Sequence, residues 1–155
     1  MKNTKIISAF PATGKSWLFD NQSQLGLTIL DSDSSNFSWI EKGIRHPDFP
    51  NNYIQHIKDN IGKVDIICVS SHDVVREALQ DNNIHYILVY PNVNNKEEYI
   101  QRFENRGNDE KFIEFISNNW NKFIEDMDNE TFPRRMTLPF GEHLRCILDW
   151  YNYNS

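Results

Sequence analysis

The strongest constraint on this chain is the segment from Ala9 to Ser16, which reads Ala-Phe-Pro-Ala-Thr-Gly-Lys-Ser. It follows the apolar pair Ile6-Ile7 and precedes a helix that is expected to begin near Ser16. A loop that binds phosphate needs a strand end, a turn with inward N–H groups, a lysine, a hydroxyl and a following helix. All of these parts occur here in that order. The segment therefore predicts a phosphate-binding loop.

The first position of this loop departs from the usual pattern, because Ala9 stands where a glycine is common. Alanine keeps the site small but restricts φ more than glycine does, so the turn is expected to differ slightly. In the functional interpretation Lys15 reaches the β- and γ-phosphates of a nucleotide and Ser16 coordinates Mg²⁺. The alternative is a loop that joins a strand to a helix and binds nothing. The expected nucleotide-binding residues are Ala12, Thr13, Gly14, Lys15, Ser16 and Trp17.

Length and composition favour one ordinary globular domain over residues 1–155. Charged residues make up 25% and aromatic residues 13%, and a chain of this size buries a core without disulfides or a structural metal. The formal net charge of −6 argues against a surface that holds duplex nucleic acid along its whole length. Cys68 and Cys146 have neither zinc-ligand nor disulfide spacing, so both are expected in the core. Without a membrane-length apolar run or a signal peptide, we expect a cytoplasmic monomer or homodimer with no membrane partner.

Apolar runs and helical patterns alternate along the chain, which predicts a parallel α/β sheet with helices on both faces. Residues 34–49 are the exception, because they look irregular, with Trp39-Ile40 as an anchor, and are expected to form a mobile substrate-binding region. Strands are expected at 5–10, 27–30, 64–69, 86–90 and 134–138. Helices are expected at 16–21, 53–61, 74–79, 96–106 and 112–127, with a last helix that buries Leu144, Ile147, Leu148 and Tyr151. The first of these helices should carry Trp17 and Leu18 toward the sheet. Helix 112–127 has an amphipathic stripe that is expected to be core, formed by Phe112, Ile113, Ile116, Trp120, Phe123, Ile124 and Met127.

Two aspartates follow the second predicted strand, in the sequence Asp31-Ser32-Asp33. In an open α/β sheet ligands gather outside the carboxyl ends of the strands, so these aspartates should face the same crevice as the phosphate loop. There they could orient a substrate hydroxyl, accept its proton or, in the case of Asp31 with Ser16, help to hold Mg²⁺. The alternative is that one or both aspartates only cap a turn.

The chain resembles the small P-loop kinases in three features. These are the Ala9–Ser16 loop, the Asp31-x-Asp33 pair and an arginine-bearing segment after the fourth predicted strand. This group includes nucleoside monophosphate kinases, shikimate-type kinases and the kinase domains of polynucleotide kinases. The resemblance covers nearly the whole chain. It implies a three-layer parallel sheet of strand order 2-3-1-4-5, ATP as phosphoryl donor and Mg²⁺ as the metal ion.

The resemblance also implies a short lid, here around residues 99–110, whose arginines close on the donor phosphates. Arg102 and Arg106 lie where such arginines would be, and guanidinium groups there would neutralise charge on the transferring phosphoryl group. The alternative is that both are exposed and pair with Glu98 or Glu110. The expected catalytic residues are Lys15, Asp31, Asp33, Arg102 and Arg106.

Arginines are also expected on the acceptor side of the site. Arg45, in the loop after the aspartates, and Arg76, on the helix after the third strand, resemble the arginines that hold an acceptor phosphate in monophosphate kinases. Bidentate capture of a phosphate suits the guanidinium group, and Asp33 is expected to contact the acceptor as well. Each arginine could instead be a solvated surface residue. His72 lies at a strand end, where a lone histidine is more often structural than functional.

The third predicted strand ends in Ser70-Ser71, where many P-loop NTPases carry an aspartate for the Mg²⁺ shell. This difference argues against a switch GTPase or a motor ATPase. It leaves Ser16, the phosphates, water and Asp31 to hold the ion.

The leading hypothesis is an ATP- and Mg²⁺-dependent phosphotransferase that acts on a nucleotide-like acceptor, with a (deoxy)nucleoside monophosphate favoured by the acidic balance. The alternative acceptor is a polynucleotide end or a modified DNA base, for which the Arg134-Arg135 pair and the aromatic richness speak. A second class is a non-catalytic ATP-binding module that contacts a partner through helix 112–127 or through Trp150-Tyr151.

Overall fold

A five-stranded sheet forms the centre of the protein, whose computed structural model describes residues 1–41 and 44–146. Every neighbouring pair of strands in this sheet is parallel. The order across the sheet is β2-β5-β1-β6-β7. The predicted α/β architecture with a parallel sheet is therefore confirmed. The strands are β1 (Lys5–Ala9), β2 (Ile29–Asp31), β5 (Ile66–Ser70), β6 (Ile87–Pro91) and β7 (Arg134–Leu138).

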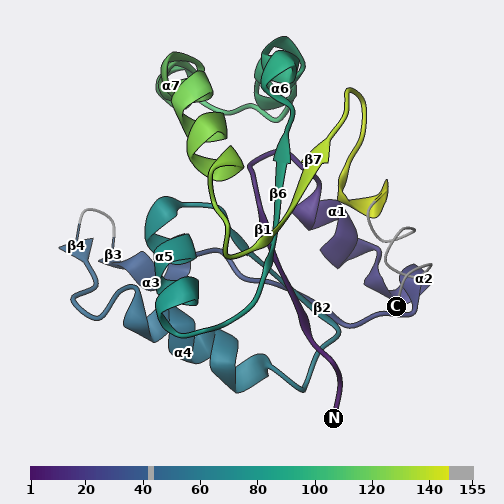
Figure 1. The fold of residues 1–155 in the computed structure, drawn as a ribbon, viewed down its shortest axis with the longest axis vertical. Coiled ribbons are helices and arrows are strands. Elements are labelled where there is room, and N and C mark those ends of the chain that lie inside the picture. The colour runs from purple at the N-terminus through teal and green to yellow at the C-terminus, as the bar shows by residue number, and fades with distance from the viewer. Residues whose placement is uncertain (42–43, 147–155) are drawn as a thin grey trace.

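Helices cover both faces of this sheet (Figure 1). On one side lie α1 (Lys15–Asp20) and the short α2 (Gln22–Leu25), and on the other lie α4 (Asn51–Asn60) and α5 (Asp73–Asp81). Because both faces are covered, the central strands are buried almost throughout, which accounts for their nearly continuous apolar sequences.

Two further helices follow β6 and extend beyond the end of the sheet (Figure 1). A 3-10 turn, η1 (Val93–Asn95), leads into α6 (Lys96–Asn105), and α7 (Glu110–Asp128) packs beside α6. The amphipathic stripe predicted over residues 112–127 is confirmed as core. Its fully buried members are Ile116, Trp120, Ile124 and Met127.

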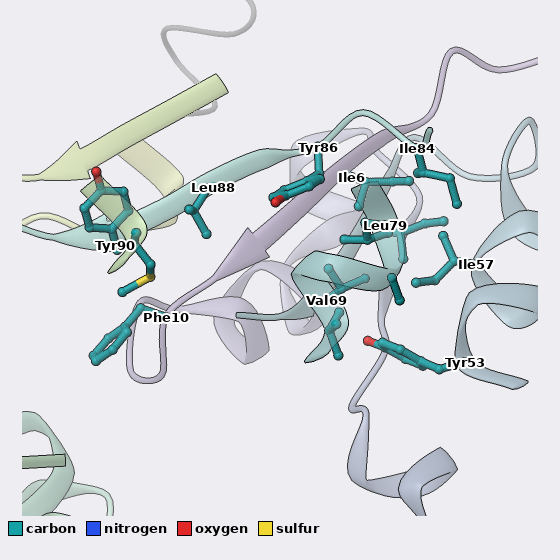
Figure 2. Close-up of a cluster of buried hydrophobic side chains, with 14 of the residues drawn as sticks. Ile6, Phe10, Tyr53, Ile57, Val69, Leu79, Ile84, Tyr86, Leu88 and Tyr90 are labelled. Atoms are coloured by element: carbon teal, nitrogen blue, oxygen red, sulfur yellow. The ribbon is translucent and has the colours of Figure 1, made fainter. Parts of the chain in front are cut away.

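The hydrophobic core is divided by the sheet into two clusters. Ile6 belongs to the larger cluster with α4, α5, α6 and α7, whereas Ile7 belongs to the smaller cluster with Leu18 of α1. Neighbouring residues of β1 fall on opposite faces because side chains alternate along a strand. Figure 2 shows part of the larger cluster, in which Ile6 gathers with Ile57 of α4 and Leu79 of α5.

The expectation that residues 34–49 are irregular is wrong for residues 35–41 and 44–45. They contain α3 (Ser35–Ser38) and a small antiparallel sheet formed by β3 (Trp39–Glu41) and β4 (Ile44–Arg45). Elements this short carry too few residues to show a periodic apolar pattern, which is why the sequence did not reveal them.

Phe37, rather than Trp39 and Ile40, anchors this segment to the protein. The ring of Phe37 lies 5.2 Å from that of Tyr53 and 4.7 Å from that of His56, both on α4. The side-chain amide of Asn52 also donates a hydrogen bond to the Phe37 carbonyl at 2.8 Å. Trp39 and Ile40, by contrast, are 38% and 62% exposed.

The two cysteines differ in burial. Cys68 is fully buried in β5, as predicted, but Cys146, expected in the core as well, is only half-buried. The other residues expected in the last helix, Ile147, Leu148 and Tyr151, lie outside the described residues, as does Trp150. Among the helices of the described part of the chain, none has both the length and the apolar character needed to cross a membrane.

Candidate functional site

Hydrogen bonds to three carbonyl groups hold the loop between β1 and α1. The Thr13 hydroxyl donates to the Phe10 carbonyl at 2.7 Å, within the loop itself. Arg102 of α6 donates to the Ala12 carbonyl at 2.9 Å. The N–H of Leu144, from the segment after β7, donates to the Thr13 carbonyl at 2.9 Å. Donors from distant parts of the chain therefore engage the oxygens of this loop.

The N–H groups of the loop are left available. Within the described residues, no backbone–backbone hydrogen bond is donated by residues 12–16. Ala12 and Gly14 have positive φ angles of 66° and 105°, and alternation of this kind gathers N–H groups into concavities that bind anions. Lys15 and Ser16 begin α1 directly after them. Available N–H groups, a lysine and a hydroxyl in one turn fit a phosphate group.

The unusual backbone of this loop falls at Ala12 and not at Ala9. Ala9 ends β1 as an ordinary, fully buried strand residue. Ala12 adopts the left-handed region of backbone conformation, which residues other than glycine and asparagine rarely enter. The alanine at position 9 is therefore not associated with unusual backbone at that position.

A cavity of about 830 Å³ opens beside this loop, at the carboxyl ends of β1, β2 and β5. Residues of α5, α6 and α7 complete its lining. The volume lies in the usual range for a small-molecule site. The predicted residues that line the cavity are Ala12, Gly14, Lys15, Ser16, Asp31, Asp33, Arg76, Arg102 and Arg106.

The register of the sheet brings the aspartates to the loop between β1 and α1. Ala9 at the end of β1 pairs with Ser70 of β5, and Asp31 of β2 pairs with Cys68, two residues before Ser70. Asp31 therefore lies at the same edge as the loop, separated from β1 by a single strand. Ser70 and the following Ser71 also line the cavity.

The turn that carries the aspartates is fixed through Ser32. The Ser32 N–H donates to the Cys68 carbonyl at 2.9 Å, and the Tyr53 hydroxyl donates to the Ser32 carbonyl at 2.6 Å. The Ser32 hydroxyl lies 2.9 Å from Nε2 of His56. The residue between the two aspartates thus holds the turn, and the carboxylates of Asp31 and Asp33 are presented to the cavity.

The pKa of the Asp31 carboxyl is raised above its ordinary value, chiefly because it is partly buried. Lys15 opposes this rise, while the negative charges of Asp33 and Asp20 add to it. The coupling between Asp31 and Lys15 shows that the aspartate and the loop lysine act on one another electrostatically. A carboxylate with a raised pKa is a stronger proton acceptor than an ordinary aspartate.

Arg76 is 7% exposed and is held by groups on two sides. Its Nε donates to the Ser71 carbonyl at 2.8 Å, and its Nη1 pairs with Glu130, just after α7. Glu130 also accepts a hydrogen bond of 3.0 Å from the Tyr86 hydroxyl. A buried arginine that lines a cavity and is oriented in this way is not a solvated surface residue, which was the alternative for Arg76.

The two predicted lid arginines have different surroundings. Arg102 is largely buried, donates to the Ala12 and Glu142 carbonyls, and lies 3.5 Å from Glu98. It therefore does pair with Glu98, but it is not an exposed arginine. Arg106, at the end of α6, is exposed and lines the cavity, and no ion pair with Glu110 is found in the described residues.

Two histidines contribute to the lining. His72, which was expected to be structural more often than functional, lines the cavity. Its backbone N–H donates a hydrogen bond to the Ser70 hydroxyl at 3.1 Å. Burial lowers the pKa of His72, and the positive charges of Lys15 and Arg76 add to this effect. His143 also lines the cavity, and burial together with neighbouring arginines lowers its pKa.

Three predicted binding residues do not line the cavity. Arg45 lies on the β3–β4 hairpin with its guanidinium 4.3 Å from the centre of the Trp39 ring. Thr13 is fully buried and supports the loop from within. Trp17 is 41% exposed on α1, so the prediction that it packs toward the sheet is wrong, and only its neighbour Leu18 does so.

Sequence reasoning missed one side of the cavity, which α7 supplies. Phe115, Lys122, Phe123 and Asp126 line it, although only Phe123 belonged to the predicted core stripe. Phe115 carried a usable signal, because it is an aromatic residue on the face of an amphipathic helix where polar residues are expected. It is 57% exposed.

Comparison with protein-family models finds none that matches this chain, and comparison with curated proteins also finds no match. The function is therefore argued from the site itself. Within residues 1–41 and 44–146, no group of three or more His, Cys, Asp and Glu side chains could hold a metal ion. A Mg²⁺ ion here would need oxygen ligands from a bound nucleotide in addition to those of the protein.

Proposed function

We propose that this protein is an ATP- and Mg²⁺-dependent phosphotransferase of the small P-loop kinase class. The observation that carries the proposal is the common cavity of the loop with its available N–H groups, Lys15, the Asp31 and Asp33 carboxylates and the arginines of α5 and α6. The sheet supports the proposal. When its five strands are numbered 1 to 5 along the chain, leaving out β3 and β4 of the separate hairpin, their order across the sheet is the 2-3-1-4-5 that the resemblance implies.

The donor phosphates would be held by the N–H groups of residues 12–16 and by Lys15. Ser16 and Asp31, together with phosphate oxygens, would hold Mg²⁺, and the ion would supply positive charge that offsets the negative charge developing on the transferring group. Arg106 is exposed at the rim of the cavity, where its guanidinium is free to approach the same group. Arg102 supports the loop by donating a hydrogen bond to the Ala12 carbonyl.

In the reaction, an oxygen of the acceptor bonds to the γ-phosphorus, the bond from that phosphorus to the β–γ bridging oxygen breaks, and ADP leaves. A phosphate oxygen of the acceptor carries no proton that must be removed at neutral pH. For a hydroxyl acceptor, Asp31 or Asp33 would take the proton.

The charge of the cavity favours a small acceptor over a polynucleotide. Its cationic side chains are interspersed with carboxylates, and a groove that follows a nucleic-acid backbone would be consistently basic. The Arg134-Arg135 pair does not line this cavity, and Arg135 donates instead to the Asp128 carbonyl. A (deoxy)nucleoside monophosphate, whose phosphate Arg76 would hold, is therefore the proposed acceptor.

The test is to incubate the protein with γ-labelled ATP, Mg²⁺ and a panel of nucleosides, nucleoside monophosphates and oligonucleotides with free 5′-ends. We expect transfer to a monophosphate, a loss of roughly 100-fold or more in Lys15→Ala, and slower transfer with nearly unchanged ATP affinity in Asp33→Asn. Lys58→Ala is the matched control, because Lys58 is an exposed lysine of α4 that bonds Asn82.

Tight ATP binding without transfer to any member of the panel would contradict the kinase proposal. It would favour the second class of function, a non-catalytic ATP-binding module. The aromatic face considered for such a module is small in the described residues, since Trp120 is 1% exposed and Phe115 opens into the cavity.

A further inference from the structure

One face of α7 forms a side of the cavity that the proposed phosphoryl transfer does not use. Phe115, Lys122 and Asp126 are seven and four residues apart, a spacing that places side chains on one face of a helix. Phe123 lies at the border between this face and the core stripe, and it lines the cavity as well. We call Phe115, Lys122, Phe123 and Asp126 the α7 face.

The α7 face contains apolar surface that the described part of the protein leaves uncovered. Phe115 is 57% exposed, and the centre of its ring lies 5.6 Å from that of Phe123, with 59° between the ring planes. The two rings form one aromatic surface inside a cavity that otherwise carries many charged groups. An aromatic surface in a polar cavity is suited to a ligand that has both a planar apolar part and charged groups.

The α7 face is continuous with the region where the acceptor phosphate is expected. Asp73 and Arg76 of α5 and Met127 of α7 line the same cavity. Arg76 is joined to Glu130, two residues beyond the end of α7, so the guanidinium is held near that end of the helix. A ligand whose phosphate binds Arg76 can therefore reach α7 with the rest of its structure.

The phosphate loop also lies close to α7. The ring of Phe10, the first residue after β1, is 5.6 Å from that of Trp120, in the middle of α7. Phe123 follows Trp120 by about one helical turn. The aromatic surface therefore borders the same cavity as Lys15 and Ser16 of the loop.

We propose that the α7 face is the binding site for the base of a nucleoside monophosphate acceptor. The base stacks on Phe115 and Phe123, while Lys122 and Asp126 offer one cation and one hydrogen-bond acceptor to its polar edge. The proposal rests on the proposed function only in taking the acceptor to be a nucleotide. It adds that the base itself, and not the phosphate alone, determines binding.

Equilibrium binding of nucleoside monophosphates, ribose 5-phosphate and ATP to the intact protein tests this site. In Phe115→Ala we expect the affinity for the preferred monophosphate to fall roughly 5- to 150-fold, the range for losing one stacked base. Ribose 5-phosphate, which has sugar and phosphate but no base, should bind the variant and the wild type equally. ATP affinity should also be unchanged.

Two further variants make the experiment specific. Phe115→Tyr keeps an aromatic face and should retain monophosphate affinity. Phe140→Ala removes a phenylalanine that is 76% exposed but does not line the cavity, and it should have no effect. Because Phe115 is itself largely exposed, the alanine variant should fold, which thermal unfolding verifies.

The outcomes separate this proposal from the kinase function. Phosphoryl transfer with unchanged monophosphate affinity in Phe115→Ala would overturn the α7 site and leave the kinase function intact. Phe115-dependent monophosphate binding without transfer would support the site and contradict the kinase function. A loss of ATP affinity instead of monophosphate affinity would assign the face to the donor and overturn the proposal. Tighter, Phe115-dependent binding of a 5′-phosphorylated oligonucleotide would overturn the choice of a small acceptor.

Discussion

Asp31 is the residue whose ionisation should be most visible in the stability of the protein. Its pKa is raised in the folded state, chiefly by burial, so ionising it opposes folding. The stability that comes from the protonated Asp31 carboxyl is fully present at low pH and is lost as the pH rises through the folded-state pKa of Asp31. We therefore expect Asp31→Asn to be more stable than the wild type at pH 7, with the difference vanishing below about pH 3.8, the ordinary value.

Urea unfolding across this pH range, in a metal-free buffer with EDTA, measures the effect. Asp65→Asn is a control with the opposite sign, because the Thr28 N–H, Lys2 and the Thr28 hydroxyl lower the pKa of Asp65. Asp65→Asn should be less stable than the wild type at pH 7, and this difference should shrink as the pH falls through the folded-state pKa of Asp65. Equal responses of the two variants would show that the surroundings of Asp31 do not penalise its charge.

Some site residues were predictable from the sequence because local chemistry determines their position. Lys15 and Ser16 follow from the loop pattern, and Asp31 follows from its place at the end of a strand. Arg45 was not predictable in the same way, because its position depends on the hairpin that carries it and on its stacking over Trp39. Phe115 depends on how α7 is rotated about its own axis, which tertiary packing decides.

At the scale of elements, we propose separate roles for Arg102 of α6 and for Arg106, which directly follows this helix. Arg102 donates to the Ala12 carbonyl, so Arg102→Ala removes a hydrogen bond that shapes the loop between β1 and α1. We expect this variant to lose about 1–3 kcal/mol of unfolding free energy and to bind ATP more weakly. Arg106 is exposed, so Arg106→Ala should change stability by less than about 0.5 kcal/mol and lower kcat roughly 10³-fold.

Thermal unfolding and steady-state kinetics on both variants test this division. If Arg102→Ala reduces kcat without any change in stability or ATP affinity, it acts on the phosphate directly and the supporting role is wrong. If Arg106→Ala leaves kcat unchanged, the arginine at the rim of the cavity takes no part in transfer. Arg145→Ala, which removes an exposed arginine that stacks 5.5 Å from Trp17, is a control for loss of surface charge.

The long elements were predictable from the sequence, whereas the short β3 and β4 were not. The central strands and α7 each contain enough apolar residues at regular spacing to specify their type and their buried face. β3 and β4 have three and two residues, respectively, and are held by Phe37 against α4, a contact between segments that no local pattern encodes.

For the whole molecule, ligand binding should appear as increased stability. ATP and Mg²⁺ at about 100 times the dissociation constant should add about 2.7 kcal/mol to the unfolding free energy, or roughly 5–11 °C in Tm for a chain of this size. Lys15→Ala should lose this gain, whereas Lys58→Ala should keep it. Differential scanning calorimetry with a non-hydrolysable ATP analogue measures the shift, and an equal shift in Lys15→Ala would contradict nucleotide binding at the loop.

The hydrogen bond from the Leu144 N–H to the Thr13 carbonyl has a consequence for the order in which the protein is made. It joins the loop near the start of the chain to a residue that emerges from the ribosome only after β7 has been synthesised. The last strand must also find its place beside β6 before Leu144 can reach the loop. A nascent chain therefore completes the Ala9–Ser16 loop late, and if this loop binds a nucleotide as we propose, a nucleotide present during synthesis would stabilise only molecules in which the loop and the segment after β7 have already come together.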